Sequence, residues 1–263
     1  MKTVQPYNKY FYYKKAVQSP EEDVRFFKKV YKSFYKKPPV TLREDFCGTF
    51  SISVAWIKMG KTYKAIAVDA DKKPLNYGKT HHLSCLDKTQ KKDLTILQKN
   101  VLNPSLPGAD IISVSNFSYY VFKERKQLME YFGKVRKKLK KSGLFIIDAF
   151  GGSDSEGPNE EAVEEKDFTY YWEQKNFNSI TNRATFYIHF KRKGERKRLK
   201  QFTYDWRMWS LPELKDILED AGFSKVHVYW EMSDKKGDGT GVFRKQTYGE
   251  PCDSWVAYLV ALP

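Results

Sequence analysis

The sequence has few residues that form disulfide bonds or bind metal ions. Its three cysteines, Cys47, Cys85 and Cys252, are widely spaced and include no Cys-x-x-Cys pair. This pattern favours free thiols over a disulfide framework or a zinc site. The four histidines show no spacing typical of metal ligands, such as His-x-x-x-His. We therefore expect neither a disulfide scaffold nor a metal site.

The chain also lacks a long apolar run. No stretch approaches the roughly 20 apolar residues that cross a bilayer as a helix, and residues 1–7 lack the apolar segment of a signal peptide. We expect a cytoplasmic protein with no membrane partner. With 263 residues, 41% of them hydrophobic, the chain is long enough for one substantial domain with an insertion, or at most two small ones.

Acidic residues are outnumbered by basic ones, and the formal net charge is +15. Such a charge raises the question of an RNA or acidic-protein partner. The basic residues are densest at 134–141 and 191–198. The first run is typical of the last turn of a helix, and the second surrounds an expected hairpin tip at Gly194. Because no recognised RNA-binding motif accompanies them, a lysine-rich surface is the favoured interpretation.

Short apolar runs alternate with helical patterns in the first part of the chain. Strands are expected at 40–44, 64–69, 94–98, 111–114 and 144–149, with helices at 20–36, 49–59, 71 onward and 123–141. This alternation favours parallel strands covered by helices on both faces. The fold class is therefore α/β.

The pattern changes after the fifth expected strand. Residues 151–165 form a polar, acidic stretch that we interpret as a loop, and long β-type runs between 168 and 206 predict a three-stranded antiparallel insertion. A helix with a capping box at Ser210 follows, and two strands, 225–231 and 255–262, close the chain.

One motif at the end of the first strand carries most of the functional information. Residues 41–49, Thr-Leu-Arg-Glu-Asp-Phe-Cys-Gly-Thr, contain a single glycine, Gly48, and Asp69 follows it by 21 residues at the end of the second strand. In a doubly wound sheet, such a glycine lets the backbone approach a ligand, and such an acid accepts hydrogen bonds from ribose hydroxyls. The two further glycines of a dinucleotide fingerprint are missing, which disfavours pyrophosphate binding.

The motif resembles the glycine loop of class I S-adenosylmethionine-dependent methyltransferases, commonly acid-x-Gly-Cys-Gly-Thr-Gly. Cys47-Gly48-Thr49 match, Glu44 takes the place of the acid, and Phe46 and Phe50 replace the outer glycines. The order of elements from about residue 40 to 262 also resembles that family. The resemblance implies a Rossmann-like, seven-stranded, mostly parallel sheet with helices on both faces and an antiparallel β insertion after the fifth strand.

The resemblance also implies a division of the chain. The methyltransferase core would comprise residues 38–150 and 208–263, and residues 151–207 would form a cap. Residues 1–37, an aromatic segment followed by a helix, would form a lid. The cap resembles that of small-molecule N-methyltransferases such as the glycine type, which implies a small-molecule acceptor methylated at nitrogen or oxygen.

Family roles carried over residue by residue assign a binding site for S-adenosylmethionine. The resemblance implies cofactor contacts by Arg43, Glu44, Phe46, Cys47, Gly48, Asp69, Ala70, Asn100, Val101 and Asn116. Glu44 and the Cys47-Gly48 backbone would face the methionine part, Asp69 the ribose, and Ala70 the adenine. Alternatives remain open for two residues: Arg43 could pair with Glu44 or Asp45, and Asn100 could be a turn asparagine.

The substrate side is expected beyond the fourth strand and on the insertion. The candidates are Tyr12, Tyr13, Phe117, Tyr120, Trp172, His189 and Trp206. Aromatic faces stabilise a cationic methyl group, although each of these rings could instead pack in the core. His189 could act as a general base or be structural. No catalytic residue is identified, and methylation of RNA or protein, or a non-catalytic cofactor-binding module, remains the alternative function.

Overall fold

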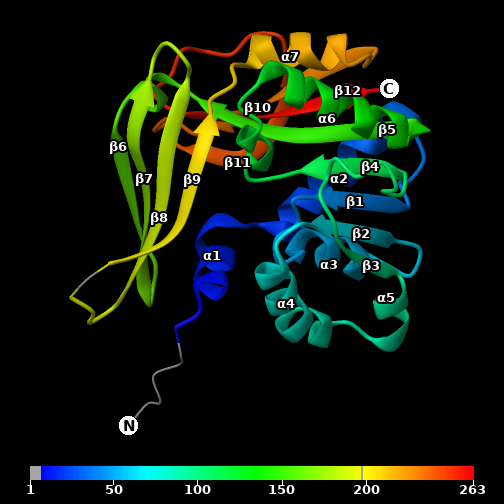
Figure 1. Ribbon diagram of the computed structural model, residues 1–263, viewed down its shortest axis with the longest axis horizontal. Coiled ribbons are helices and arrows are strands. Elements are labelled where there is room, and N and C mark those ends of the chain that lie inside the picture. Colours follow the sequence, from blue (N-terminus) through cyan, green and yellow to red (C-terminus); the bar gives the residue numbers. More distant parts are fainter. Residues whose placement is uncertain (1–6, 197) are drawn as a thin grey trace.

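The computed structural model describes residues 7–196 and 198–263, which form one α/β unit with two sheets (Figure 1). The larger sheet has eight strands in the order β11-β10-β12-β5-β4-β1-β2-β3. Strands β1 to β5 run parallel. Strand β12 pairs antiparallel with β5, and each of the next two pairs, β12 with β10 and β10 with β11, is also antiparallel. Its strands are β1 (Thr41–Asp45), β2 (Lys64–Asp69), β3 (Leu94–Gln98), β4 (Ala109–Val114), β5 (Leu139–Gly151), β10 (Lys225–Ser233), β11 (Gly239–Gln246) and β12 (Trp255–Leu262).

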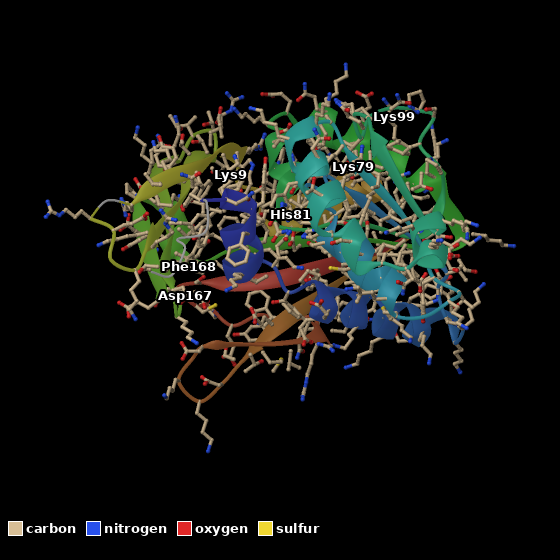
Figure 2. The ribbon with its side chains drawn as sticks, turned by 90° about the horizontal axis from the view of Figure 1, so that it is seen from below. Lys9, Lys79, His81, Lys99, Asp167 and Phe168 are labelled. Atoms are coloured by element: carbon tan, nitrogen blue, oxygen red, sulfur yellow. The ribbon has the colours of Figure 1, made fainter. Side chains whose placement is uncertain are left out.

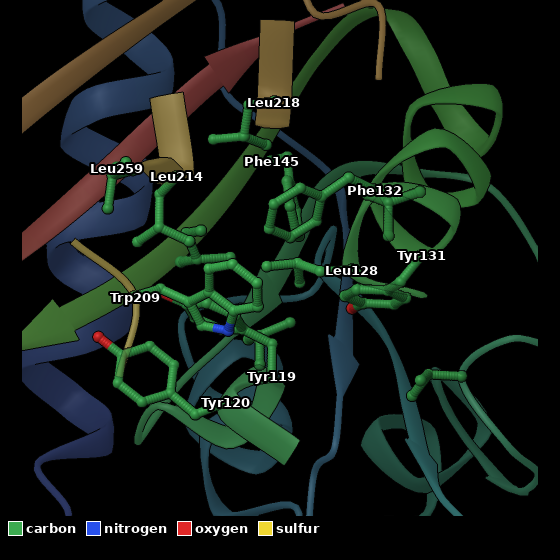
Figure 3. Close-up of a cluster of buried hydrophobic side chains, with 14 of the residues drawn as sticks. Tyr119, Tyr120, Leu128, Tyr131, Phe132, Phe145, Trp209, Leu214, Leu218 and Leu259 are labelled. Atoms are coloured by element: carbon green, nitrogen blue, oxygen red, sulfur yellow. The ribbon is translucent and has the colours of Figure 1, made fainter. Parts of the chain in front are cut away.

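Helices cover both faces of this sheet. They are α2 (Pro20–Tyr35), α3 (Ser51–Lys58), α4 (Lys72–His81), α5 (Lys88–Lys92), α6 (Arg125–Lys138) and α7 (Leu211–Asp220). Successive residues of β5 serve opposite faces: Ile146 packs with α2 and α3, whereas Phe145 packs with α6 and α7. Figure 3 shows the second of these clusters, where Phe132, Phe145 and Leu218 meet. The two apolar faces of each strand explain why parallel strands here are continuous apolar runs.

The second sheet is an antiparallel cap. Its four strands are β6 (Asn159–Glu164), β7 (Phe168–Asn178), β8 (Arg183–Arg192) and β9 (Leu199–Arg207), in that order. Helix α1 (Lys9–Val17) lies between this cap and helix α4, as Figure 2 shows for Lys9, Phe168 and Lys79. The ring of Tyr12 packs on Phe168 in the cap, with the ring centroids 4.9 Å apart.

The fold class agrees with the sequence, but the number of strands in each sheet and two helices differ from it. The main sheet has eight strands rather than seven, because β11 adds an exposed edge strand. The cap has four strands rather than three, because the acidic stretch expected as a loop contains the exposed edge strand β6. Helices α1 and α5 were not expected. Edge strands are stabilised by backbone pairing with one neighbour, so their side chains show little apolar alternation.

A buried ion pair lies at the end of β1. The Nε and Nη2 atoms of Arg43 donate to the two carboxylate oxygens of Asp45 at 2.8 and 2.9 Å. The hydroxyl of Tyr131 on α6 donates to Asp45 Oδ2 at 2.8 Å, and Arg43 Nη1 donates to the carbonyl of Pro107. Both charged side chains are almost completely buried. This network joins β1 to helix α6 at the residue that precedes the loop after β1.

Within the described ranges, no helix is long and apolar enough to cross a membrane.

We expect Asp45→Ala to destabilise the protein by roughly 3–5 kcal/mol, because Arg43 would keep a buried charge without its partner. Urea denaturation at neutral pH would measure the loss. The control is Glu124→Ala, which removes an exposed ion pair with Arg183 and should cost less than about 1 kcal/mol. Equal effects of the two variants would contradict the assignment.

Candidate active site

A first cavity of about 230 Å³ lies at the carboxyl ends of β1, β2 and β4. In open α/β sheets this edge binds ligands. The loop after β1 forms its floor, and α1 and the cap strand β9 close it from above. The lining residues are Lys9, Tyr10, Tyr13, Gln18, Glu44, Asp45, Phe46, Cys47, Gly48, Thr49, Asp71, Pro74, Ser115, Asn116, Ser118, Phe202 and Tyr204.

The loop after β1 has a left-handed backbone at three alternate positions. The φ angles are 56° at Phe46, 52° at Gly48 and 52° at Phe50. A positive φ is uncommon for bulky residues and costs about 1–3 kcal/mol. Phenylalanine therefore stands in a glycine-type conformation at both outer positions of the motif. Phe46 and Phe50 stand where the motif resembled by this sequence has glycine, and their backbone nevertheless adopts a conformation suited to glycine.

Two carboxylates organise this loop. Asp69 at the end of β2 accepts hydrogen bonds from the amides of Gly48 at 2.7 Å and Asp71 at 2.8 Å. Glu44 accepts from the amide and the hydroxyl of Ser53 on α3. Burial raises the pKa of Glu44 to about 8, despite these two hydrogen bonds. Burial also raises the pKa of Asp69, against the two backbone hydrogen bonds that it accepts.

A third carboxylate, Asp148 on β5, holds the loop after β4. Its two oxygens accept hydrogen bonds from the consecutive amides of Asn116 at 2.6 Å and Phe117 at 2.8 Å. Both residues have φ near 57°, and consecutive amides in such a turn form a concavity that binds anions. Burial raises the pKa of Asp148 to about 7. Asp148 thus fixes a strained pair of residues that lies between two cavities.

The second cavity, of about 210 Å³, lies between the cap and the main sheet. It shares Tyr13, Asn116 and Tyr204 with the first cavity, so the two meet at these side chains. The other lining residues are Val17, Phe117, Phe150, Gly151, Asp154, Ser155, Asn159, Glu161, Tyr170, Trp172, Gln174, Ile188, Trp206, Ser254 and Val256. The two cavities therefore lie side by side at these three residues.

Strand alternation decides which cap side chains reach the second cavity. Trp172 and Gln174 on β7, Ile188 on β8, and Tyr204 and Trp206 on β9 line it, all at even positions. His189 occupies the opposite face of β8, where its Nε2 lies 2.7 Å from Glu173 Oε2. His189 therefore does not line the second cavity, as a substrate contact there would require. It is buried on the opposite face of the strand beside Glu173.

Three predicted cofactor residues, Arg43, Asn100 and Ala70, do not line the first cavity. Arg43 pairs with Asp45, which is one of the alternatives that the sequence left open. Asn100 Oδ1 accepts from the amide of Leu102, as a turn asparagine does. Ala70 is exposed beside Asp69. Of these three, only Ala70 is adjacent to Asp69, the residue that binds the Gly48 amide in the loop after β1.

Three other predicted residues pack in hydrophobic clusters instead of lining a cavity. They are Val101, Tyr120 and Tyr12. Asp69 also lies outside the lining itself, but its hydrogen bond from the Gly48 amide places its carboxylate directly beside the first cavity.

Several residues of the site were not predicted from the sequence. Asp148 had a usable signal, because it is an acid inside the apolar strand Leu-Phe-Ile-Ile-Asp-Ala. Asp154 and Glu161 lie in the stretch that we expected to be a loop, and Lys9 and Tyr10 lie on the unexpected helix α1. The last four have no local sequence pattern that marks them, since only the cap and α1 bring them to the cavities.

The first cavity offers a polar ligand one unsatisfied group. Ser115 Oγ is buried and has no hydrogen-bond partner among the described residues, and Ser115 lines this cavity. A buried hydroxyl without a partner costs about 1–3 kcal/mol, which a polar ligand would offset. The Glu44 carboxyl and the neighbouring Asp69 add acceptors, so the site fits a nucleoside cofactor with an amino-acid end. In residues 7–196 and 198–263, no side-chain group is arranged to hold a metal ion.

Comparison with solved structures shows the same fold in known methyltransferases. An S-adenosylmethionine-dependent methyltransferase from Clostridium acetobutylicum has a TM-score of 0.63 at 18% identity, over 96% of both chains. A sugar N-methyltransferase from Streptoalloteichus has 0.63 at 12% identity, over 100% of this chain and 97% of that one. An amino pentose methyltransferase from Micromonospora echinaspora has 0.65 at 9% identity, over 97% and 98%.

The fold is therefore that of class I S-adenosylmethionine-dependent methyltransferases. No family model and no curated protein matches the sequence, so the similarity is one of structure.

We expect the raised pKa of Asp148 to make stability depend on pH. The folded protein retains a proton up to about pH 7, whereas the unfolded carboxyl loses it near pH 4. This contribution to stability is complete below about pH 4 and is lost as the pH rises through 7, on the order of 4 kcal/mol. Urea denaturation from pH 4 to 8 should therefore show the advantage of the wild type over Asp148→Asn shrinking with pH. Glu160→Gln, on an exposed strand, serves as the control, and an unchanged difference for Asp148→Asn would refute the effect.

Proposed function

We propose that the protein is an S-adenosylmethionine-dependent methyltransferase that acts on a small-molecule acceptor. The observation that carries the proposal is the glycine-type backbone of the loop after β1, bounded by Asp69, at the ligand-binding edge of a methyltransferase fold. Several proteins of the same fold are named as methyltransferases of sugars or amino pentoses. The first cavity would hold the cofactor and the second the acceptor.

The roles of individual residues follow from their positions. Glu44 and the Cys47-Gly48 backbone would bind the methionine part, with Ser115 donating from the end of β4. Asp69 would accept hydrogen bonds from the ribose while it keeps its hold on the Gly48 amide. Ala70 would flank the adenine at the open side of the cavity. Phe46 lines the same cavity and would cover the ligand from the side of α6.

The chain itself needs to align the acceptor and exclude water. Bound S-adenosylmethionine supplies a methyl carbon on a positively charged sulfur, which is already reactive. Tyr13, Asn116 and Tyr204 would position the acceptor atom where the cavities meet. Phe117, Trp172 and Trp206 form aromatic walls around it, which exclude water and stabilise positive charge. No side chain is assigned as a catalytic acid or base.

The described residues of the two dense basic runs lie outside the second cavity, which supports a small-molecule acceptor over RNA or protein. Residues 134–141 end helix α6 and begin β5, at the amino ends of the parallel strands. The described part of the 191–198 run lies at the end of β8 and in the hairpin that follows. Neither run lines the second cavity.

Calorimetric titration of the purified protein with S-adenosylmethionine tests the function, with NAD as a control ligand. Saturable binding of the first ligand alone, followed by formation of S-adenosylhomocysteine with a small acceptor, is the expected result. Absence of binding by the folded wild type would remove the basis of the proposal.

We expect Asp69→Ala to weaken S-adenosylmethionine binding, because a charged acceptor for the ribose is lost. A hydrogen bond to a charged group is worth about 1.5–3 kcal/mol, so affinity should fall roughly 10- to 150-fold. Asp71→Ser is the matched control, since Asp71 lines the cavity but caps helix α4 through the amide of Lys73. Calorimetry on both variants would measure the effect. Unchanged affinity in a folded Asp69→Ala protein would disprove the ribose contact.

Removal of residues 1–18 should leave a folded protein with impaired turnover. Helix α1 contributes Lys9, Tyr10 and Tyr13 to the wall of the first cavity, so its loss admits water to the junction. We expect kcat to fall at least about ten-fold, which corresponds to roughly 1.4 kcal/mol in the barrier. The control is a shorter truncation that removes residues 1–6 only. Full activity in the longer truncation would argue against a lid.

A further inference from the structure

The second cavity differs in charge from the rest of the protein. The chain has 47 Lys and Arg residues, yet within the described residues none of them, and no His, lines this cavity. Two carboxylates do: Asp154, which follows β5, and Glu161 on the edge strand β6. Neither forms an ion pair with another described residue. A phosphate or carboxylate group entering here would meet only negative charge.

The acidic character continues beyond the cavity. A wider groove of about 600 Å³ shares Phe150, Gly151 and Ser155 with it. The described lining of this groove again includes no basic side chain, and its charged residues are Glu156, Glu250 and Asp253. Clefts lined by one sign of charge concentrate ligands of the opposite sign. The groove beside the acceptor cavity therefore also favours a cation.

Aromatic rings form most of the cavity wall. Seven line it: Tyr13, Phe117, Phe150, Tyr170, Trp172, Tyr204 and Trp206. Several lie close together, with ring centroids 4.4 Å apart for Tyr204 and Trp206 and 4.5 Å apart for Phe117 and Phe150. The faces of such rings attract ammonium groups, most strongly where water is excluded. Aromatic and acidic side chains together form a site suited to a positively charged nitrogen.

Two side-chain amides supply acceptor oxygens. Gln174 is 3% exposed and its Nε2 donates to the carbonyl of Ser155 at 2.8 Å. This bond directs the donor end of the amide to the protein and leaves Oε1 for a donor on the ligand. Asn116 lines both cavities and its backbone is fixed by Asp148. An N–H group on the acceptor would therefore find partners in the cavity and at the junction.

We propose that the methyl acceptor is an amine that is positively charged at neutral pH, with its nitrogen at the junction of Tyr13, Asn116 and Tyr204. This inference rests on the proposed function. The bound ammonium first releases a proton to water at the mouth of the cavity. The nitrogen lone pair then forms the N–C bond while the S–C bond breaks and its electron pair stays on sulfur. The methylated ammonium product keeps one positive charge.

A hydroxyl acceptor fits the same residues less well. An alcohol needs a base to remove its proton during attack. The described residues where the two cavities meet, Tyr13, Asn116 and Tyr204, include no His, Lys, Asp or Glu. An amine carries its own lone pair once it is neutral. The cavity therefore supplies binding and orientation for an amine without a dedicated base.

Binding of matched probes tests the inference. The protein is saturated with S-adenosylhomocysteine and titrated at low salt with tyramine and its alcohol analogue tyrosol, and with choline and its neutral isostere 3,3-dimethyl-1-butanol. We expect the cation of each pair to bind at least ten-fold more tightly than the neutral partner. Salt should reduce this preference, because charge attraction is screened.

Two variants on one strand provide the control. Glu161 lines the cavity, whereas Glu160 faces outward and pairs with Arg198. We expect Glu161→Gln to reduce the cation preference several-fold and Glu160→Gln to leave it unchanged. Both positions are exposed, so both variants should fold.

The outcomes separate this inference from the proposed function. S-adenosylhomocysteine binding without a cation preference, or methyl transfer to alcohols but not to amines, overturns the amine acceptor and leaves the methyltransferase standing. Failure to bind S-adenosylhomocysteine removes the proposed function itself. Equal effects of Glu160→Gln and Glu161→Gln would also overturn the amine site.

Discussion

The candidate site depends on one constraint: the backbone after β1 must turn through three left-handed residues to form the floor of the first cavity. Two of these residues, Phe46 and Phe50, are not glycine, so the path is strained and must be held from outside. The Gly48 amide is bound by Asp69, and the carbonyl of Thr49 lies 2.9 Å from Nδ1 of His82. Hydrogen bonds from two neighbouring elements thus maintain the loop.

A glycine on the facing helix makes room for Phe50. Phe50 is fully buried against helix α4, where a side chain at Gly78 would come within 2.4 Å of its ring. The glycine that permits close approach is therefore on the facing helix rather than in the loop. Burial of the Phe50 ring offsets the backbone strain, since a buried aromatic side chain contributes about 1.5–3 kcal/mol. Phe50 and Gly78 therefore pack directly against each other.

At the junction of the two cavities, a carboxylate again holds residues that have a left-handed backbone. Asp148 on β5 accepts hydrogen bonds from the amides of Asn116 and Phe117. Strand β5, which is followed by the cap, therefore also fixes the loop after β4. Helix α1 and strand β9 then close the space above with Tyr13 and Tyr204. Residues of the core, the loops and the cap thus form the walls of both cavities. Although the protein has a net positive charge, its second cavity is acidic and aromatic.

The sequence by itself determined the α/β class, most strands of the main sheet and the motif from Glu44 to Thr49 with Asp69, because these depend on apolar periodicity and on a short spacing. It did not determine α1, α5, β6 or β11, which are short helices or exposed edge strands that pair with one neighbour. Only the tertiary structure decided that His189 lies on the strand face opposite the cavity while Trp172 and Trp206 face it, since a shift of one residue reverses the face of a strand. It also brought Asp154 and Glu161 to the second cavity, because charge at a site is set by distant segments that meet in space.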